Sequence, residues 1–132
     1  MTNGPLREAL QPVLDDLDRS HPGLIEAVLW DRGPRDDPSN GGVLLRDADG
    51  HGPILRPQEE ADIHVRWQVT DTAQEAVVEA LWSAGKPAVW PNCPDHPNTH
   101  PLNAAISPSR ALVWACPLSD RVICAVGDLP AE

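Results

Sequence analysis

The nine residues CPDHPNTHP, at positions 93–101, gather side chains that can bind a metal ion. Cys93 and His96 are separated by two residues, a spacing that lets one tight turn direct both side chains at the same ion. His100 follows His96 after three further residues, which is also within the spacing of zinc ligands. The prolines of the segment restrict its backbone, so little freedom is lost when an ion binds. The spacing therefore predicts a rigid metal-binding loop.

A second cysteine donor is expected from the stretch ALVWACPLSD, at positions 111–120. Its apolar residues predict a strand, and the strand ends at Cys116, which is followed by proline just as Cys93 is. Two thiolates together with imidazoles form a soft ligand set, which favours zinc over magnesium or calcium.

Three residues compete for the remaining position beside Cys93, His96 and Cys116. His100 is preferred, because its loop already carries two ligands; it completes a Cys₂His₂ set. Asp120 would be a hard carboxylate beside two thiolates, a less common combination. Cys124 lies in an alternating apolar pattern over residues 120–127, which predicts a small buried side chain on a strand.

The two Cys-Pro turns, joined by a hairpin-like link through NAAISPSRA, resemble the layout of zinc ribbons and related Cys/His zinc modules. The resemblance covers residues 90–126 and rests on the four donors. A ribbon carries two cysteines in each turn, whereas Ser119 stands at the matching place here. The resemblance implies a β-hairpin held by a structural Zn²⁺, shielded by Trp90 and Trp114.

Other interpretations of these residues remain. The loop could be a surface turn without a metal, or Cys93 and Cys116 could form a disulfide. A closed set of four protein ligands predicts a structural ion, whereas three ligands and a water would predict a zinc-dependent hydrolase. In that case Asp95 or Asp120 would serve as general base. Motifs of zinc proteases, zinc deaminases and phosphate-binding loops are missing, which argues against an enzyme.

Composition limits the partners. The chain has 132 residues, a formal net charge of −10 and three cysteines. This charge argues against nucleic acid, which is bound through Lys and Arg, and favours a basic protein as partner. No signal peptide and no run of 18 apolar residues is visible, so we expect a cytoplasmic protein that does not span a membrane. The role that fits best is that of a protein-binding or accessory protein.

The periodicity of the N-terminal part predicts helices and strands around one core. Apolar residues at helical spacing predict a helix over residues 5–19, and an apolar run predicts a strand over 24–30. Residues 31–42 have the composition of a loop. The next stretch, over 43–57, predicts a hairpin that closes around Asp49-Gly50, with strands near 43–47 and 54–56.

The stretch ADIHVRWQVT alternates apolar and polar residues and predicts a strand over 62–70, with His64 on its polar face. A helix over 71–84 is predicted to follow, with Asp71 as N-cap and Gln74 at the capping-box position.

The chain is thus expected to be a single α+β domain over residues 1–132. Residues 1–85 would form a small mixed or antiparallel sheet with two helices. Residues 86–132 would form a zinc-stabilised, zinc-ribbon-like β-hairpin module, which is too short to fold by its own core.

Overall fold

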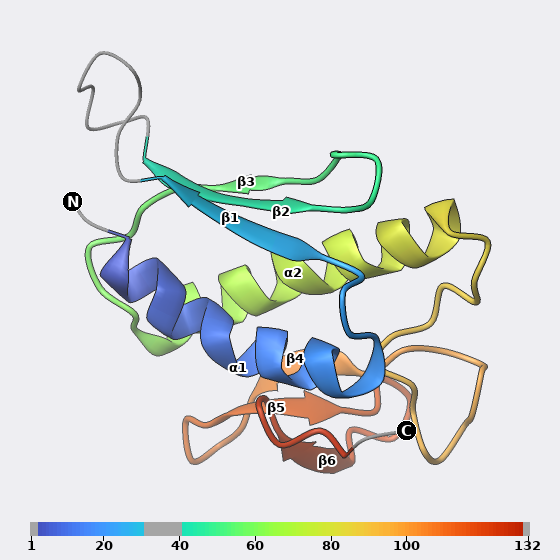
Figure 1. The fold of residues 1–132 in the computed structure, drawn as a ribbon. Coiled ribbons are helices and arrows are strands. Elements are labelled where there is room, and N and C mark those ends of the chain that lie inside the picture. The colour runs from blue at the N-terminus through green and yellow to red at the C-terminus, as the bar shows by residue number, and fades with distance from the viewer. Residues whose placement is uncertain (1–2, 31–40, 131–132) are drawn as a thin grey trace.

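The computed structural model describes residues 3–30 and 41–130. Two helices lie between two small antiparallel sheets, one above and one below them in Figure 1. In chain order the elements are α1 (Gly4–Ser20), β1 (Glu26–Trp30), β2 (Gly42–Arg46), β3 (Ile54–Leu55), α2 (Ile63–Ser83), β4 (Asn103–Ile106), β5 (Leu112–Ala115) and β6 (Val122–Ala125). The α+β class and the two helices agree with the sequence, but the described residues form two three-stranded sheets instead of one sheet and a hairpin.

Helix α1 confirms the helix predicted over 5–19. Its buried side chains recur at helical spacing: Leu6, Ala9, Leu10, Val13, Asp16 and Leu17. Pro12 lies inside the helix on the partly exposed side. Asp16 is the one charged residue in this buried stripe and is completely shielded from solvent.

The first sheet has the order β1-β2-β3 and confirms the predicted strands near 24–30, 43–47 and 54–56. The hairpin between β2 and β3 closes as expected. The N–H of Asp47 bonds the carbonyl of His51 at 2.8 Å, and the Asp47 carboxylate accepts from the N–H of Asp49. Of the predicted loop over 31–42, residues 31–40 lie outside the described part of the chain.

The strand predicted over 62–70 is wrong, because these residues form the first two turns of α2. The N-cap is Asp62, whose carboxylate accepts from the N–H of Val65 at 2.9 Å, and not Asp71. Gln74 accordingly lies in the middle of the helix, and His64 is exposed on its first turn. These residues form a helix and not a strand because the helix that they begin buries one continuous stripe of side chains, from Val69 to Leu81.

The second sheet has the order β4-β5-β6. Strands β5 and β6 agree with the strands expected within residues 111–116 and 120–127, and they pair with each other as a hairpin that was not predicted, with an irregularity in register between Trp114 and Ala115. Strand β4 comes from the segment expected to be a link and pairs with β5 from Asn103↔Ala115 to Ile106↔Leu112. The module is therefore a three-stranded meander.

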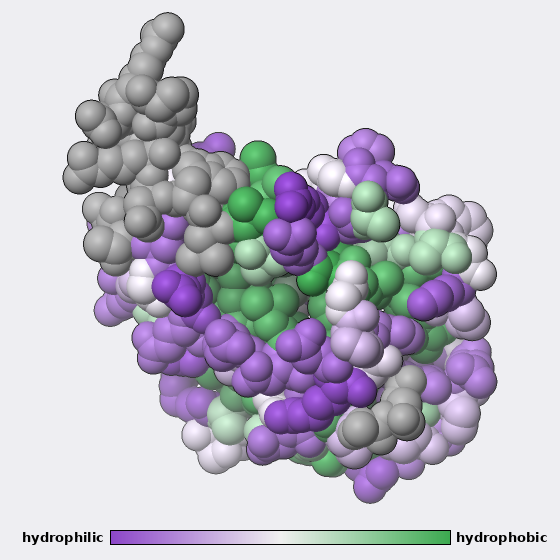
Figure 2. All heavy atoms as spheres, viewed as in Figure 1, coloured by the Kyte–Doolittle hydropathy of each residue, from purple (hydrophilic) through white to green (hydrophobic). Residues whose placement is uncertain are grey.

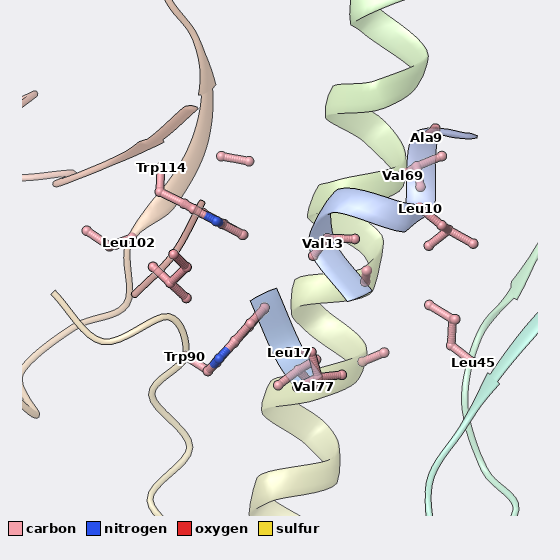
Figure 3. Close-up of a cluster of buried hydrophobic side chains, with 14 of the residues drawn as sticks. Ala9, Leu10, Val13, Leu17, Leu45, Val69, Val77, Trp90, Leu102 and Trp114 are labelled. Carbon is pink, nitrogen blue, oxygen red and sulfur yellow. The ribbon is translucent and has the colours of Figure 1, made fainter. Parts of the chain in front are cut away.

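One hydrophobic core joins the helices to both sheets. In Figure 3, Leu45 lies on one side of the helices, and Trp90, Trp114 and Leu102 lie on the other. The two indole rings meet edge to face, with centroids 5.7 Å apart. On the face of the molecule in Figure 2, hydrophilic residues cover α1, and a hydrophobic hollow separates α1 from the first sheet.

Neither helix in the described residues has the length and hydrophobicity that a membrane crossing requires.

Candidate metal centre

The structure brings Cys93, His96, His100 and Cys116 together. One donor atom from each lies within 4.8 Å of the donor atoms of the other three. Three of the residues come from the loop between α2 and β4, and Cys116 follows β5 directly. Both cysteines are free thiols and fully buried, and both histidines are partly buried. This Cys₂His₂ cluster could hold a metal ion.

The donor spacing fits a tetrahedral ion. Bonds of about 2.3 Å to sulfur and about 2.0 Å to nitrogen separate neighbouring ligand atoms by about 3.3 to 3.8 Å. The Nδ1 atom of His96 lies 3.7 Å from the Sγ atom of Cys93 and 3.7 Å from that of Cys116. The Nε2 atom of His100 lies 3.9 Å from Cys116 Sγ and 3.0 Å from His96 Nδ1. These distances are close to the edges of such a tetrahedron.

A backbone carbonyl sets the tautomer of His100. Its Nδ1 atom lies 2.9 Å from the carbonyl oxygen of Pro101, and a carbonyl can only accept, so Nδ1 carries the proton. In the neutral ring, Nε2 then presents its lone pair to His96 Nδ1 and to Cys116. The 3.0 Å contact between His100 Nε2 and His96 Nδ1 requires either a proton on His96 Nδ1, which makes it a hydrogen bond, or a cation that both nitrogens bind.

The loop that carries the histidines is closed at its base. Asn92 and Pro101 form an antiparallel bridge, and the N–H of Leu102 bonds the carbonyl of Pro91 at 2.8 Å. The side chain of Asn92 also accepts from the N–H of Asn98 at 2.9 Å. These bonds fix both ends of the loop, so its rigidity does not depend on proline alone.

The turn after β5 provides hydrogen bonds that favour the thiolate form of Cys116. A hydrogen bond with the Ser119 hydroxyl is the largest of the effects that lower the pKa of the Cys116 thiol to about 6. Burial opposes this shift, and backbone hydrogen bonds with Ser119 and Leu118 add to it. The turn closes through the Asp120 N–H, which bonds the Cys116 carbonyl at 2.8 Å. A thiolate is the form of cysteine that binds metals.

The other two candidates for the fourth position do not join the cluster. Asp120 is exposed in the turn, and its carboxylate is not among the grouped donors. Cys124 lies on β6, where burial is the main cause that raises the pKa of its thiol to about 11, followed by the charges of Asp16 and Asp128. Cys124 is thus a partly buried strand residue, close to the environment expected for it.

An ion pair links the two segments that form the cluster. The Arg121 guanidinium donates two hydrogen bonds to the Asp95 carboxylate, at 2.7 and 2.9 Å. This pairing lowers the pKa of Asp95 below its ordinary value and raises that of Arg121. Asp95 is therefore a weaker base than a free carboxylate, which disfavours the general-base role considered for it.

Two helix residues support the segments that carry the cluster: Gln74, which was predicted only as a capping-box residue, and Asp16, to which no role was assigned. Gln74 of α2 donates to the carbonyls of Trp90 and Leu102, at 3.1 and 2.6 Å, and so ties together both ends of the histidine loop. Asp16 of α1 accepts from the indole N–H of Trp114 at 2.8 Å. The signal in the sequence was a polar residue inside each apolar helical stripe.

The tryptophans expected to shield the metal lie in the core and anchor the module to α1. The indole N–H of Trp90 donates to the Ser20 hydroxyl at 2.8 Å, in parallel with the bond from Trp114 to Asp16. Both side chains are fully buried.

A second group of possible donors is made of Asp47, Asp49 and His51. These residues belong to the hairpin turn between β2 and β3, and the Asp47 carboxylate is occupied by two backbone N–H groups. This agrees with the turn predicted around Asp49-Gly50, and such exposed turns need no ion.

In comparisons with protein-family models, curated proteins and solved structures, the chain shows no significant match.

Proposed function

We propose that Cys93, His96, His100 and Cys116 bind one Zn²⁺ as a structural ion, and that the protein so stabilised serves to bind another protein. The proposal of a zinc site is supported by one observation: two thiols and two imidazoles lie together at distances close to those of a tetrahedral site. The proposal of a protein partner rests on the charge of the chain.

Zinc is the ion that this donor set fits best. Thiolates and imidazoles are soft or borderline ligands, which calcium and magnesium avoid. The two thiolates also cancel the charge of Zn²⁺, so the ion can sit beside buried residues without a net charge. Four-coordinate Cys₂His₂ sites are typical of structural zinc.

The closed set supports a structural role over the alternative of a zinc-dependent hydrolase. Catalysis needs a coordination position for water. The close approach of His100 to His96, at 3.0 Å, supports His100 as the fourth ligand, in which case no coordination position would remain for a water. Its hydrogen bond to the Pro101 carbonyl fixes the ring in the orientation that ligation requires.

A protein partner fits the surface better than a nucleic acid does. The net charge of −10 repels phosphate backbones, and the basic stripe on which nucleic-acid binding depends is missing from the sequence. A basic protein surface would be attracted instead, and its affinity would fall as salt is added.

The first experiment is metal analysis of the chain purified without added metal. One zinc per chain is expected, and the Cys116→Ser and His100→Ala variants should retain far less. Cys124→Ser and His64→Ala are matched controls, because both residues lie outside the cluster, and these variants should keep the zinc.

Replacement by Co²⁺ gives an independent test, since thiolate ligation produces a charge-transfer band that Cys116→Ser should reduce. A chain that contains no metal and does not take up Zn²⁺ or Co²⁺ would contradict the proposal. Full zinc in His100→Ala would contradict the closed set and bring the hydrolase alternative forward.

A further inference from the structure

A small apolar pocket lies directly beside the cluster. Its volume is about 340 Å³, at the lower end of the range of ligand-binding pockets. It is lined by Asn92, Cys93, Pro94, Pro97, Ile123, Leu129 and Pro130. One wall is thus the histidine loop, the second is β6, and the third is the segment after β6.

Contacts with the rest of the protein hold two of these walls in place. Cys93 and the two loop prolines are fixed by the cluster and by the closed base of the loop. On the opposite side, the N–H of Leu129 donates to the Asp16 carboxylate at 2.9 Å. The pocket is therefore formed before anything binds, which lowers the entropic cost of binding.

Acidic residues neighbour the lining of this apolar pocket in the sequence. Asp95 and Asp128 directly neighbour lining residues in the chain, and Asp120 lies in the adjacent turn; all three are exposed. Two basic residues lie near these groups: Arg121 is paired with Asp95, and Arg19 of α1 donates to the carbonyls of Gly127 and Leu129. Asp120 and Asp128 are exposed acidic side chains, which would attract a basic partner.

The neighbouring strand offers a further means of contact. In the described part of the chain, β6 pairs with β5 on one side only, so it is an edge strand of the second sheet. Edge strands usually avoid pairing with another chain by carrying charged residues or proline. The residues of β6, VICA, include neither. Leu118 and Val122, in the turn before the strand and at its start, are exposed apolar side chains.

We propose that this pocket is the docking site of the partner and receives one aliphatic side chain from an extended peptide segment that carries Lys or Arg beside it. The proposal rests on the proposed function, because the metal holds the loop that forms one wall. A second copy of the chain is disfavoured as occupant, since it would bring the same acidic surface and a like net charge of −10.

The probe is a phage-displayed library of random peptides, selected on the immobilised, zinc-loaded chain. Selected peptides should combine Leu, Ile or Val with flanking Lys or Arg. A synthetic peptide of the enriched sequence, labelled with a fluorophore, then gives the affinity by fluorescence anisotropy. The affinity should fall as salt is added, because part of it comes from Asp120 and Asp128.

Two variants test the pocket itself. Ile123→Glu places a charge in the wall and should weaken binding by about tenfold or more. Pro130→Glu also introduces a charge, at an exposed position near the rim where a substitution should not disturb folding. The matched control is Ile54→Glu, which changes an exposed aliphatic residue of the first sheet and should leave the affinity unchanged. Zinc content and circular dichroism verify that each variant is folded.

The outcomes separate the two proposals. If the chain takes up neither Zn²⁺ nor Co²⁺ but still selects peptides that lose affinity in both pocket variants, the docking site is supported and the metal proposal is overturned. A zinc-loaded chain that selects no such peptides, or whose peptides bind both variants at full strength, would overturn the docking site alone. A dimer in light scattering that Ile123→Glu and Pro130→Glu both dissociate would show that a second copy occupies the pocket, against the proposal.

Discussion

The two sheets are attached to the same pair of helices in different ways. The first sheet offers aliphatic side chains to the core, with Val43 and Leu45 of β2 completely buried. The second sheet and its loop also place large apolar side chains in the core, namely Trp90, Leu102 and Trp114, but in addition they form hydrogen bonds to buried polar residues of the helices. Asp16 receives four donors, among them Trp114, and Gln74 bonds two carbonyls.

The two kinds of contact differ in how strictly they fix the positions of the atoms that they join. Aliphatic contacts tolerate small shifts, because their attraction depends on area and not on direction. Hydrogen bonds to a buried carboxylate or amide require a defined distance and angle. A site that must hold four donor atoms around one ion needs such positioning, and the polar contacts occur on the side of the molecule that carries the cluster.

The largest effect should come from removal of the metal. Isolated zinc modules gain about 10 kcal/mol or more from the ion, whereas the first sheet depends on aliphatic burial. Hydrogen–deuterium exchange, followed by mass spectrometry before and after chelation, should show a large loss of protection in residues 90–126 and a small one in β2. Equal loss in both regions would mean that they unfold as one unit and that the contrast drawn here is wrong.

A smaller effect is expected from Asp16→Ala. The substitution leaves buried N–H groups of Trp114, Gly127 and Leu129 without acceptors, and the free energy of unfolding should fall by about 3 to 5 kcal/mol. Denaturation of the zinc-loaded chain in urea measures this change.

The matched variant in the other region is Leu45→Ala, which should cost about 2 to 5 kcal/mol by leaving a cavity. The two variants should differ in zinc affinity, which only Asp16→Ala is expected to weaken. A comparable loss of zinc affinity in Leu45→Ala would contradict the separation of the two regions.

A further effect concerns pH in the metal-free chain. The pKa of Cys116 falls from its ordinary value of 9.0 to about 6 in the folded chain, so the folded state binds fewer protons than the unfolded state between these values. This contribution to stability is therefore fully present above about pH 9 and is lost as the pH falls through 6.

Cys124 gives the opposite behaviour and serves as the comparison, because the pKa of its thiol is raised to about 11. Ultraviolet absorbance of thiolates should show an early titration step that Cys116→Ser removes and a late one that Cys124→Ser removes. Loss of the early step in Cys124→Ser instead would contradict the assignment.

The sequence predicted the proximity of the four donors well, because three of them are fixed by local spacing within nine residues. The strands of the first sheet were likewise evident from short apolar runs and turn residues. Ligation by these donors, the protein partner and the division into two parts remain predictions.

The errors have physical causes. Alternation over residues 62–70 suggested a strand, yet the stretch from 58 to 84 contains neither glycine nor proline, so one long helix starting at Asp62 was the simpler solution. Strand β4, in the segment NAAI, is only four residues long and has just three apolar residues, so its pairing with β5 is set by tertiary contacts. The roles of Asp16 and Gln74 depend on partners that spacing cannot reveal.

The position of Asp16 in the sequence has a consequence for biosynthesis. Its partners Trp114, Gly127 and Leu129 come 98, 111 and 113 positions later in the chain. Since a nascent chain emerges from its N-terminus, α1 can form early while its carboxylate is still bonded to water. The second sheet can dock only after residues near 127 have left the ribosome. The final step of folding therefore joins one of the first elements made to one of the last segments made.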